Sequence, residues 1–192
     1  IAEQEFAIAA RTAILSFIVV FGITKAITNY YTGTLANRYG RKNLLVIGWI
    51  VGLPVPFMLM FAPDWNWIIA ANVLLGINQG LTWSSTVVMK IDLVGEKKRG
   101  LAMGINESAG YISVALVAFL TGWIAGEYGL RPYPFIIGIV LVVLGLILSI
   151  LFITDTMQRV ALETPTSSLP RLINIFRETT WTNKYLGSVT QA

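Results

Sequence analysis

The sequence predicts an all-α integral membrane protein, built as a bundle of membrane-spanning helices. Of its 192 residues, 55% are hydrophobic and 12% are charged, and its mean hydropathy of +0.69 is too high for a water-soluble domain of this length. Several apolar runs reach the about 20 residues that a helix needs to cross the hydrocarbon core. Only helices and closed barrels span lipid, and these runs lack the two-residue alternation of barrel strands, so we expect helices.

Five runs are expected to cross the membrane. Their approximate bounds are 6–30, 44–62, 65–89, 100–126 and 133–154. The first run contains Arg11 near one end and Lys25 nearer the other, where long cationic side chains can reach an interface or a wet cavity. The fourth contains one charged residue, Glu107, and the other three contain none.

The positions of the cations predict the orientation of the bundle. Short connections rich in Lys and Arg stay on the cytoplasmic side. The cations outside the spans gather in three segments: Arg38, Arg41, Lys42; Lys90, Lys97, Lys98, Arg99; Arg159, Arg171, Arg177, Lys184. The intervening connections at 62–67 and 126–133 hold one cation, Arg131. The basic segments are therefore expected in the cytoplasm, which suits a multi-pass protein of the plasma (inner) membrane, and the net charge of +4 gives no reason to expect a nucleic-acid partner.

Cysteine and histidine are both absent from the sequence. Their absence excludes disulfides, thiolate or imidazole metal ligands, and catalysis of the Ser/His/Asp or Cys/His type. We therefore expect no catalytic residues, no metal site, no cofactor and no enzymatic activity. A membrane-embedded enzyme is an alternative that has only scattered carboxylates to draw on.

The stretch GTLANRYGRK at 33–42 joins the first two apolar runs and combines glycines with cations. Glycines permit a tight turn between antiparallel helices, and the cations fix the inner face and can pair with acids on a neighbouring helix. The stretch resembles the signature of the major facilitator superfamily of transporters, glycine-x-Leu-(Ala/Ser)-Asp-(Arg/Lys)-x-Gly-Arg-(Arg/Lys), found between their second and third helices. The matching residues are Gly33, Leu35, Ala36, Arg38, Gly40, Arg41 and Lys42. An ordinary basic turn is the alternative.

Asn37 departs from this signature, because the family has an aspartate at that position. In the resemblance, the aspartate helps to lock the cytoplasmic side through charge pairing. An amide can accept a hydrogen bond but carries no charge, so we expect a weaker inner gate.

The second basic connection also resembles the superfamily, with Asp92 at the end of the fourth helix and Arg99 just before the fifth. The resemblance implies that these two residues bond to the first basic loop and hold the cytoplasmic helix ends together. A solvated charge cluster is the alternative.

The register of the signature implies which part of a transporter this chain represents. The resemblance makes the five runs helices two to six of a twelve-helix bundle, with helix one and the C-terminal half absent, so that 1–154 is a transmembrane bundle. Residues 155–192 correspond to the central cytoplasmic loop, with a short amphipathic helix near 169–178. Along the spans, Gly48, Gly52, Pro54 and Pro56 are expected to bend the second run, and the pairs Gly100/Gly104 and Gly122/Gly126 offer close approach on the fourth.

Polar residues at membrane depth are the candidates for a solute site, because they usually face a cavity or a neighbouring helix. They are Lys25, Asn72, Asn78, Gln79, Thr86, Asn106 and Glu107. Glu107 lies about 12 Å along the helix axis from Arg99, and a carboxylate at that depth could bind a proton or a cationic group of the solute. Interhelical hydrogen bonds, or an ion pair of Glu107 with Lys25, are the alternatives.

The predicted function is that of a secondary transporter that moves a small solute by alternating access. Coupling of this movement to protons is one mode that the sequence leaves open. Its expected partners are the lipid bilayer, the small-molecule substrate and the remaining half of the transporter. The family's Arg-x-x-Gln-Gly pattern appears as Gly76-Ile-Asn-Gln-Gly80, and the Gly-Pro motif of drug/proton antiporters is replaced around Gly110, which disfavours a multidrug antiporter. A non-transporting protein of the same fold, such as a sensor or an assembly factor, is the alternative.

Overall fold

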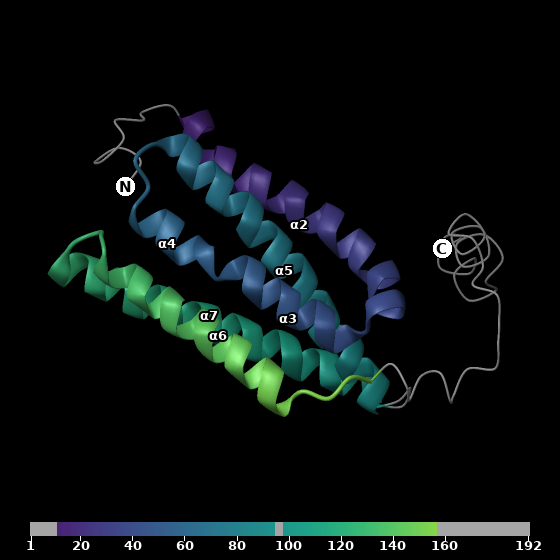
Figure 1. The fold of residues 1–192 in the computed structure, drawn as a ribbon. Coiled ribbons are helices and arrows are strands. Elements are labelled where there is room, and N and C mark those ends of the chain that lie inside the picture. The colour runs from purple at the N-terminus through teal and green to yellow at the C-terminus, as the bar shows by residue number, and fades with distance from the viewer. Residues whose placement is uncertain (1–10, 95–97, 157–192) are drawn as a thin grey trace, which may run out of the picture. The chain divides into compact units, whose positions relative to one another are not determined.

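The computed structural model describes residues 11–94 and 98–156, and this part of the chain is helical without strands. The helices follow one another as α2 Arg11–Tyr39, α3 Arg41–Gly52, α4 Pro54–Met60, α5 Trp65–Val94, α6 Arg99–Tyr128 and α7 Tyr133–Phe152 (Figure 1). The all-α prediction is confirmed for these residues. The amphipathic helix expected near 169–178 and most of the loop expected at 155–192 lie outside them.

Three of the described helical segments are long and apolar enough to cross a membrane. They are Arg41–Met60, which joins α3 and α4, Arg99–Tyr128, and Tyr133–Phe152. The helices α2 and α5 are 29 and 30 residues long, so their length suffices for a span, but they carry more polar residues. That α2 and α5 also span the membrane stays a prediction.

Helix α5 packs against α2 on one side and α3 on the other (Figure 1). Glycines make both contacts close. A Cβ atom at Gly80 would lie 2.5 Å from the Cβ of Thr28 on α2, and one at Gly48 would lie 2.7 Å from Cγ2 of Thr82 on α5. Since any side chain at these positions would force the helices apart, glycine sets the short distance between them.

The second apolar run is interrupted at Leu53, between α3 and α4. Pro54 begins α4, where its missing N–H costs no hydrogen bond, and its ring disfavours a continuous helix through the preceding turn. The bend expected from the glycines and prolines of this run therefore takes the form of a break between two helices.

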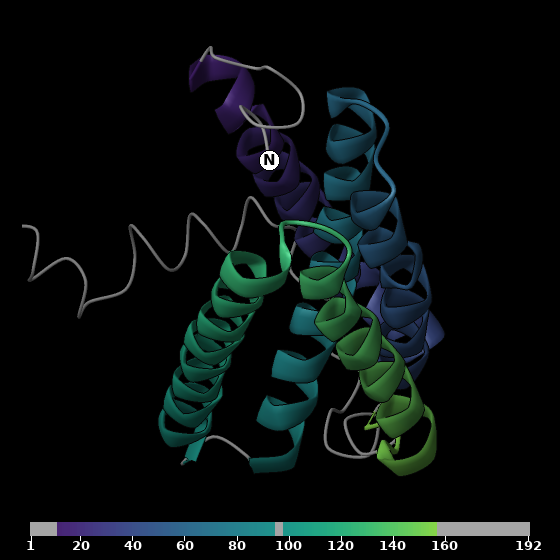
Figure 2. The ribbon, with the colours of Figure 1, turned by 90° about the vertical axis from the view of Figure 1, so that its left-hand side faces the viewer.

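Helices α6 and α7 form a looser part of the bundle. They meet at the end where residues 129–132 connect them and diverge toward the other end (Figure 2). A Cβ atom at Gly100, Gly104, Gly122 or Gly126 would have no described neighbour within 4 Å. The close approach predicted at these glycines is thus wrong for the described residues. The tight glycine contacts of α6 and α7 lie instead at Gly110, against Trp83, and at Gly145, against Trp49.

Candidate functional site

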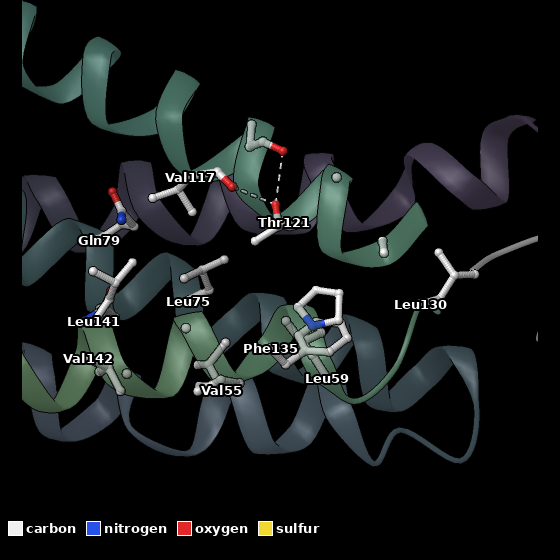
Figure 3. A pocket seen from close by; sticks show the side chains of 18 of the residues that line it. Val55, Leu59, Leu75, Gln79, Val117, Thr121, Leu130, Phe135, Leu141 and Val142 are labelled. Atoms are coloured by element: carbon white, nitrogen blue, oxygen red, sulfur yellow. Dashed lines mark hydrogen bonds between the residues drawn. The ribbon is translucent and has the colours of Figure 1, made fainter. Parts of the chain in front are cut away.

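A large apolar cavity lies between α3, α4, α5, α6 and α7 (Figure 3). Its volume is about 730 Å³, and its walls include Leu59, Leu75, Val117 and Leu141. The hydroxyl of Thr121 also faces this region, but it donates to the backbone oxygen of Val117 at 2.8 Å. Most of the lining therefore offers apolar surface.

Two further cavities adjoin the first one. One of about 740 Å³ shares Trp49, Gln79 and Thr121 with the apolar cavity, and one of about 280 Å³ shares Gln79 and Trp83 with that second cavity. Gln79 lines all three. The three cavities are thus neighbouring parts of one region beside α5, and Gln79 is the residue that they all share.

The polar end of this region contains the charged side chains. Lys90 on α5 lines the 740 Å³ cavity and donates through Nζ to Oδ1 of Asn106 on α6. Asn106 is 7% exposed, and its Nδ2 lies 3.4 Å from Oε1 of Glu107, a long and weak hydrogen bond. Across the described part of the bundle, the bond between Lys90 and Asn106 is the one side-chain hydrogen bond that joins α6 to another helix.

Lys25 and Glu107 line the same 280 Å³ cavity. The ammonium of Lys25 lies 5.7 Å from the ring centroid of Phe21 and 5.8 Å from that of Trp83, a distance at which a cation is attracted to an aromatic face. Within the described residues Lys25 and Glu107 form no salt bridge. The ion pair considered as an alternative role for these two residues is therefore not formed in this structure.

The remaining solute candidates divide into two kinds. Thr86 lines the 740 Å³ cavity, with its hydroxyl donating to the backbone of Thr82 at 2.7 Å. Asn78 reaches the apolar cavity, but its Nδ2 donates to the backbone oxygen of Gly48 at 2.8 Å and ties α5 to α3. Asn72 is buried, and its Nδ2 donates to the backbone oxygen of Ile68 at 2.9 Å, within its own helix. The geometry thus groups Lys25, Gln79, Thr86, Asn106 and Glu107, and gives Asn72 and Asn78 backbone partners.

Lys90 was assigned by its sequence position to a cytoplasmic turn, and the structure corrects that assignment. Helix α5 continues to Val94, so Lys90 lies on the helix and faces the cavity. A signal for this was present in the sequence, since Lys90 follows Thr86 by four residues and Gln79 by eleven, spacings that return to one face of a helix.

The signature loop brings Arg41 to the end of α5. Arg41 begins α3, and its Nε lies 3.0 Å from Oδ2 of Asp92, with side chains 6% and 12% exposed. Gly40, just before α3, has a φ of +86°, a backbone conformation that other residues rarely adopt. The resemblance implied that Asp92 bonds to this loop, and the structure places the two groups in contact.

The residues that follow α7 contribute to the same cluster, which the sequence did not reveal. Oδ2 of Asp155 accepts a hydrogen bond of 3.0 Å from the backbone N–H of Lys42 in the first turn of α3, where a carboxylate is favoured. Thr156 donates to Oδ2 of Asp92 at 2.7 Å, and Nζ of Lys42 donates to the backbone oxygen of Ile150 at 2.9 Å. We call Arg41, Lys42, Asp92, Asp155 and Thr156 the end cluster, because it joins the ends of α3, α5 and α7.

Other residues of the predicted gate stand apart from the end cluster. Gly33, Asn37 and Arg38 are exposed on α2, and the guanidinium of Arg38 lies 5.3 Å from the ring centroid of Tyr39. Arg99 is exposed at the start of α6 and makes no ion pair with a described residue. The structure therefore places Asp92, but not Arg99, against the first basic loop.

Comparison with known proteins identifies the family. The Major Facilitator Superfamily profile matches residues 1–188, so the chain belongs to this superfamily, and it is an integral membrane protein of the all-α transporter fold. It is 31% identical over 147 residues to the multi-drug resistance efflux pump PmrA of Streptococcus pneumoniae, a match that covers 76% of this chain and 36% of the relative. Multidrug resistance protein MdtG of Enterobacter lignolyticus is 32% identical over 148 residues, covering 74% and 34%. The chain thus spans about a third of the length of these relatives.

Proposed function

We propose that this chain forms part of a secondary transporter that moves a small solute across the plasma membrane by alternating access. The observation that carries the proposal is the region of three adjoining cavities beside α5, with apolar walls at one end and Lys25, Lys90 and Glu107 at the other. A concave, mostly apolar site with a few polar groups is typical of a small-molecule site. Charged residues within membrane helices usually mark a pathway for solute or ions.

Because the chain spans about a third of the length of these relatives, the proposal assigns the rest of the transporter to residues outside this sequence. In the proposal, the remaining half supplies the other wall of the solute site, and rocking of the two halves exposes the site to each side in turn. The end cluster serves as the inner gate of this half, because it holds the ends of three helices together.

The names of the relatives favour export of drug-like solutes. These names count against our expectation that the missing motifs disfavour a multidrug antiporter. The packing of Gly76 explains why the arginine of the Arg-x-x-Gln-Gly pattern is missing. A Cβ atom at Gly76 would lie 2.9 Å from the backbone oxygen of Phe21 and 3.1 Å from the backbone nitrogen of Lys25, so an arginine cannot occupy this position without moving α2. Within residues 11–94 and 98–156, we see no feature that favours the sensor, assembly-factor or enzyme alternatives.

Glu107 is the proposed coupling residue. It lines the 280 Å³ cavity with Lys25, and a carboxylate there can take up and release a proton as the site opens to either side.

The first test measures proton movement by the full-length protein in liposomes that contain a trapped pH-sensitive dye. A panel of metabolites and drugs is added to wild type, to Glu107→Gln, and to Glu127→Gln, an exposed carboxylate near the end of α6. We expect at least one solute to move protons in wild type and Glu127→Gln, and the proton signal to be lost in Glu107→Gln. Equal solute flux in all three without proton movement would make Glu107 structural, and absence of any flux would contradict transport.

A further inference from the structure

We propose that the solute site takes an amphipathic organic anion, with the apolar body beside α6 and the anionic group near Lys25 and Lys90. The inference rests on the proposed function, because it names the class of solute that the transport site accepts. It follows from three features of the cavities: an apolar compartment of suitable size, an excess of cations at one end, and a tryptophan that lines both cavities containing a lysine.

The apolar compartment suits a hydrocarbon or aromatic body. Its volume of about 730 Å³ lies within the range of roughly 300–1,000 Å³ that is usual for small-molecule sites. Two of its polar side chains are already bonded, since Thr121 donates to the backbone of its own helix and Asn78 donates to Gly48, which leaves the amide of Gln79 and the indole N–H of Trp49. A ligand with many hydroxyl groups, such as a sugar, would leave most of those groups without partners in this compartment.

The polar end carries more positive than negative charge. Two lysines, Lys25 and Lys90, line the cavities, whereas Glu107 is the one carboxylate among the described lining residues. Lys90 bonds to the neutral amide of Asn106, and Lys25 lies over the rings of Phe21 and Trp83. Each ammonium has three donors, so both lysines keep donors for an acceptor on the ligand. An anion would offset a charge that is costly to hold among membrane helices.

Trp83 and Gln79 lie where the compartments meet. Trp83 lines both cavities that contain a lysine, and its ring already attracts the ammonium of Lys25. Gln79 lines all three cavities, and its amide makes no side-chain hydrogen bond to the described residues. An aromatic body next to Trp83 would place an attached anionic group in the cavities that the two lysines line, with the amide of Gln79 as an additional donor.

The test compares three probes with the same aromatic body and fixed charge: 2-naphthalenesulfonate, neutral 2-naphthalenesulfonamide and the cationic 2-naphthyltrimethylammonium ion. Binding to the full-length protein in detergent is measured by isothermal titration calorimetry, and flux is measured in liposomes with empty liposomes as the blank. We expect the sulfonate to bind at least about tenfold more tightly than the other two probes, as one charge-assisted contact would give.

The variants are Lys25→Met and Lys90→Met, which keep the length and apolar stem of each side chain and remove its charge. Each is expected to weaken sulfonate binding about tenfold or more and to leave binding of the sulfonamide within about twofold. Lys98→Met is the matched control, because Lys98 is exposed at the start of α6 and lines none of the described cavities. Lys25→Arg and Lys90→Arg keep the charge, so they should retain binding. If the methionine variants fail to fold, Lys25→Gln and Lys90→Gln remove the charge in their place, and the same loss of sulfonate binding is expected.

The outcomes separate this inference from the proposed function. Lysine-dependent binding of the sulfonate without flux of any probe supports the anion site and contradicts transport of these solutes. Flux of the cationic or neutral probe in preference to the sulfonate supports transport and overturns the anion site. Sulfonate binding that is equal in wild type, Lys25→Met and Lys90→Met also overturns it, because the sulfonate would then be bound elsewhere.

Discussion

At the scale of single residues, Arg41 and Asp92 show how the signature loop acts on the fold. Their side chains are 6% and 12% exposed, so both charges have lost most of their water, and each stabilises the other. Oδ2 of Asp92 also accepts a hydrogen bond from Thr156. The pair is therefore a structural element of the bundle, whatever its role in gating.

Removing one charge of this pair should cost more than removing both. We expect Asp92→Asn to destabilise the protein by about 3 kcal/mol, because it leaves the buried guanidinium of Arg41 without its counter-charge, whereas Arg41→Met combined with Asp92→Leu should recover most of the loss. The measurement is thermal unfolding of the purified full-length protein, with Glu127→Gln as an exposed control. An Asp92→Asn protein as stable as the control would show that the pair contributes little.

At the scale of helices, glycine determines which elements lie close together. Gly76 and Gly80 let α2 approach α5, and Gly48 and Gly52 let α3 approach it from the other side. Hydroxyl and amide groups complete these contacts, as when Ser84 donates to Oδ1 of Asn29 at 2.8 Å. Small side chains and interhelical hydrogen bonds are the usual means of association in a membrane, where the hydrophobic effect between helices is weak.

A methyl group at the contact between α2 and α5 should disturb it. We expect Gly80→Ala to lower stability by about 1–3 kcal/mol, because the new Cβ would lie 2.5 Å from Thr28 Cβ and the helices would have to move apart. Gly22→Ala is the control on α2, since its Cβ would meet nothing within 4 Å, and there alanine should be neutral or slightly stabilising. The measurement is thermal unfolding of both variants. An equal loss of stability in Gly80→Ala and Gly22→Ala would contradict the packing role of Gly80.

The helices of this protein could be predicted from its sequence, whereas most contacts between them could not. Long apolar runs predict helices because the bilayer leaves the backbone no alternative, and the family signature was recognisable from its spacing. The pairing of glycines could not be predicted, since Gly100 and Gly104 carry the same four-residue spacing as Gly76 and Gly80 and meet no described neighbour. Asp155 and Thr156 were missed for a related reason: their partners are distant in the sequence, and an acid after a helix carries no local signal of what it binds.

At the scale of the whole molecule, the cation distribution predicts that the two ends of α6 lie on opposite sides of the membrane. Cysteine is absent from this sequence, so single cysteines that replace Lys98 and Glu127 report the side directly once any cysteine outside it has been replaced. We expect a membrane-impermeant maleimide added to intact cells to label Glu127→Cys and to label Lys98→Cys only after the membrane is opened. The reverse pattern would overturn the assigned orientation.

The loose attachment of α6 has a consequence for evolution. Helices α2, α3 and α5 share several close glycine contacts. Helix α6 forms a wall of the cavities, and it is joined to the other described helices by one side-chain hydrogen bond and one close glycine contact, that of Gly110 with Trp83. Substitutions that fall on well-packed surfaces usually destabilise a protein, and those on open surfaces usually change stability little. Lineages that descend from such a chain can therefore alter the residues of α6 that face the solute, and so the range of compounds accepted, while the rest of the bundle stays intact.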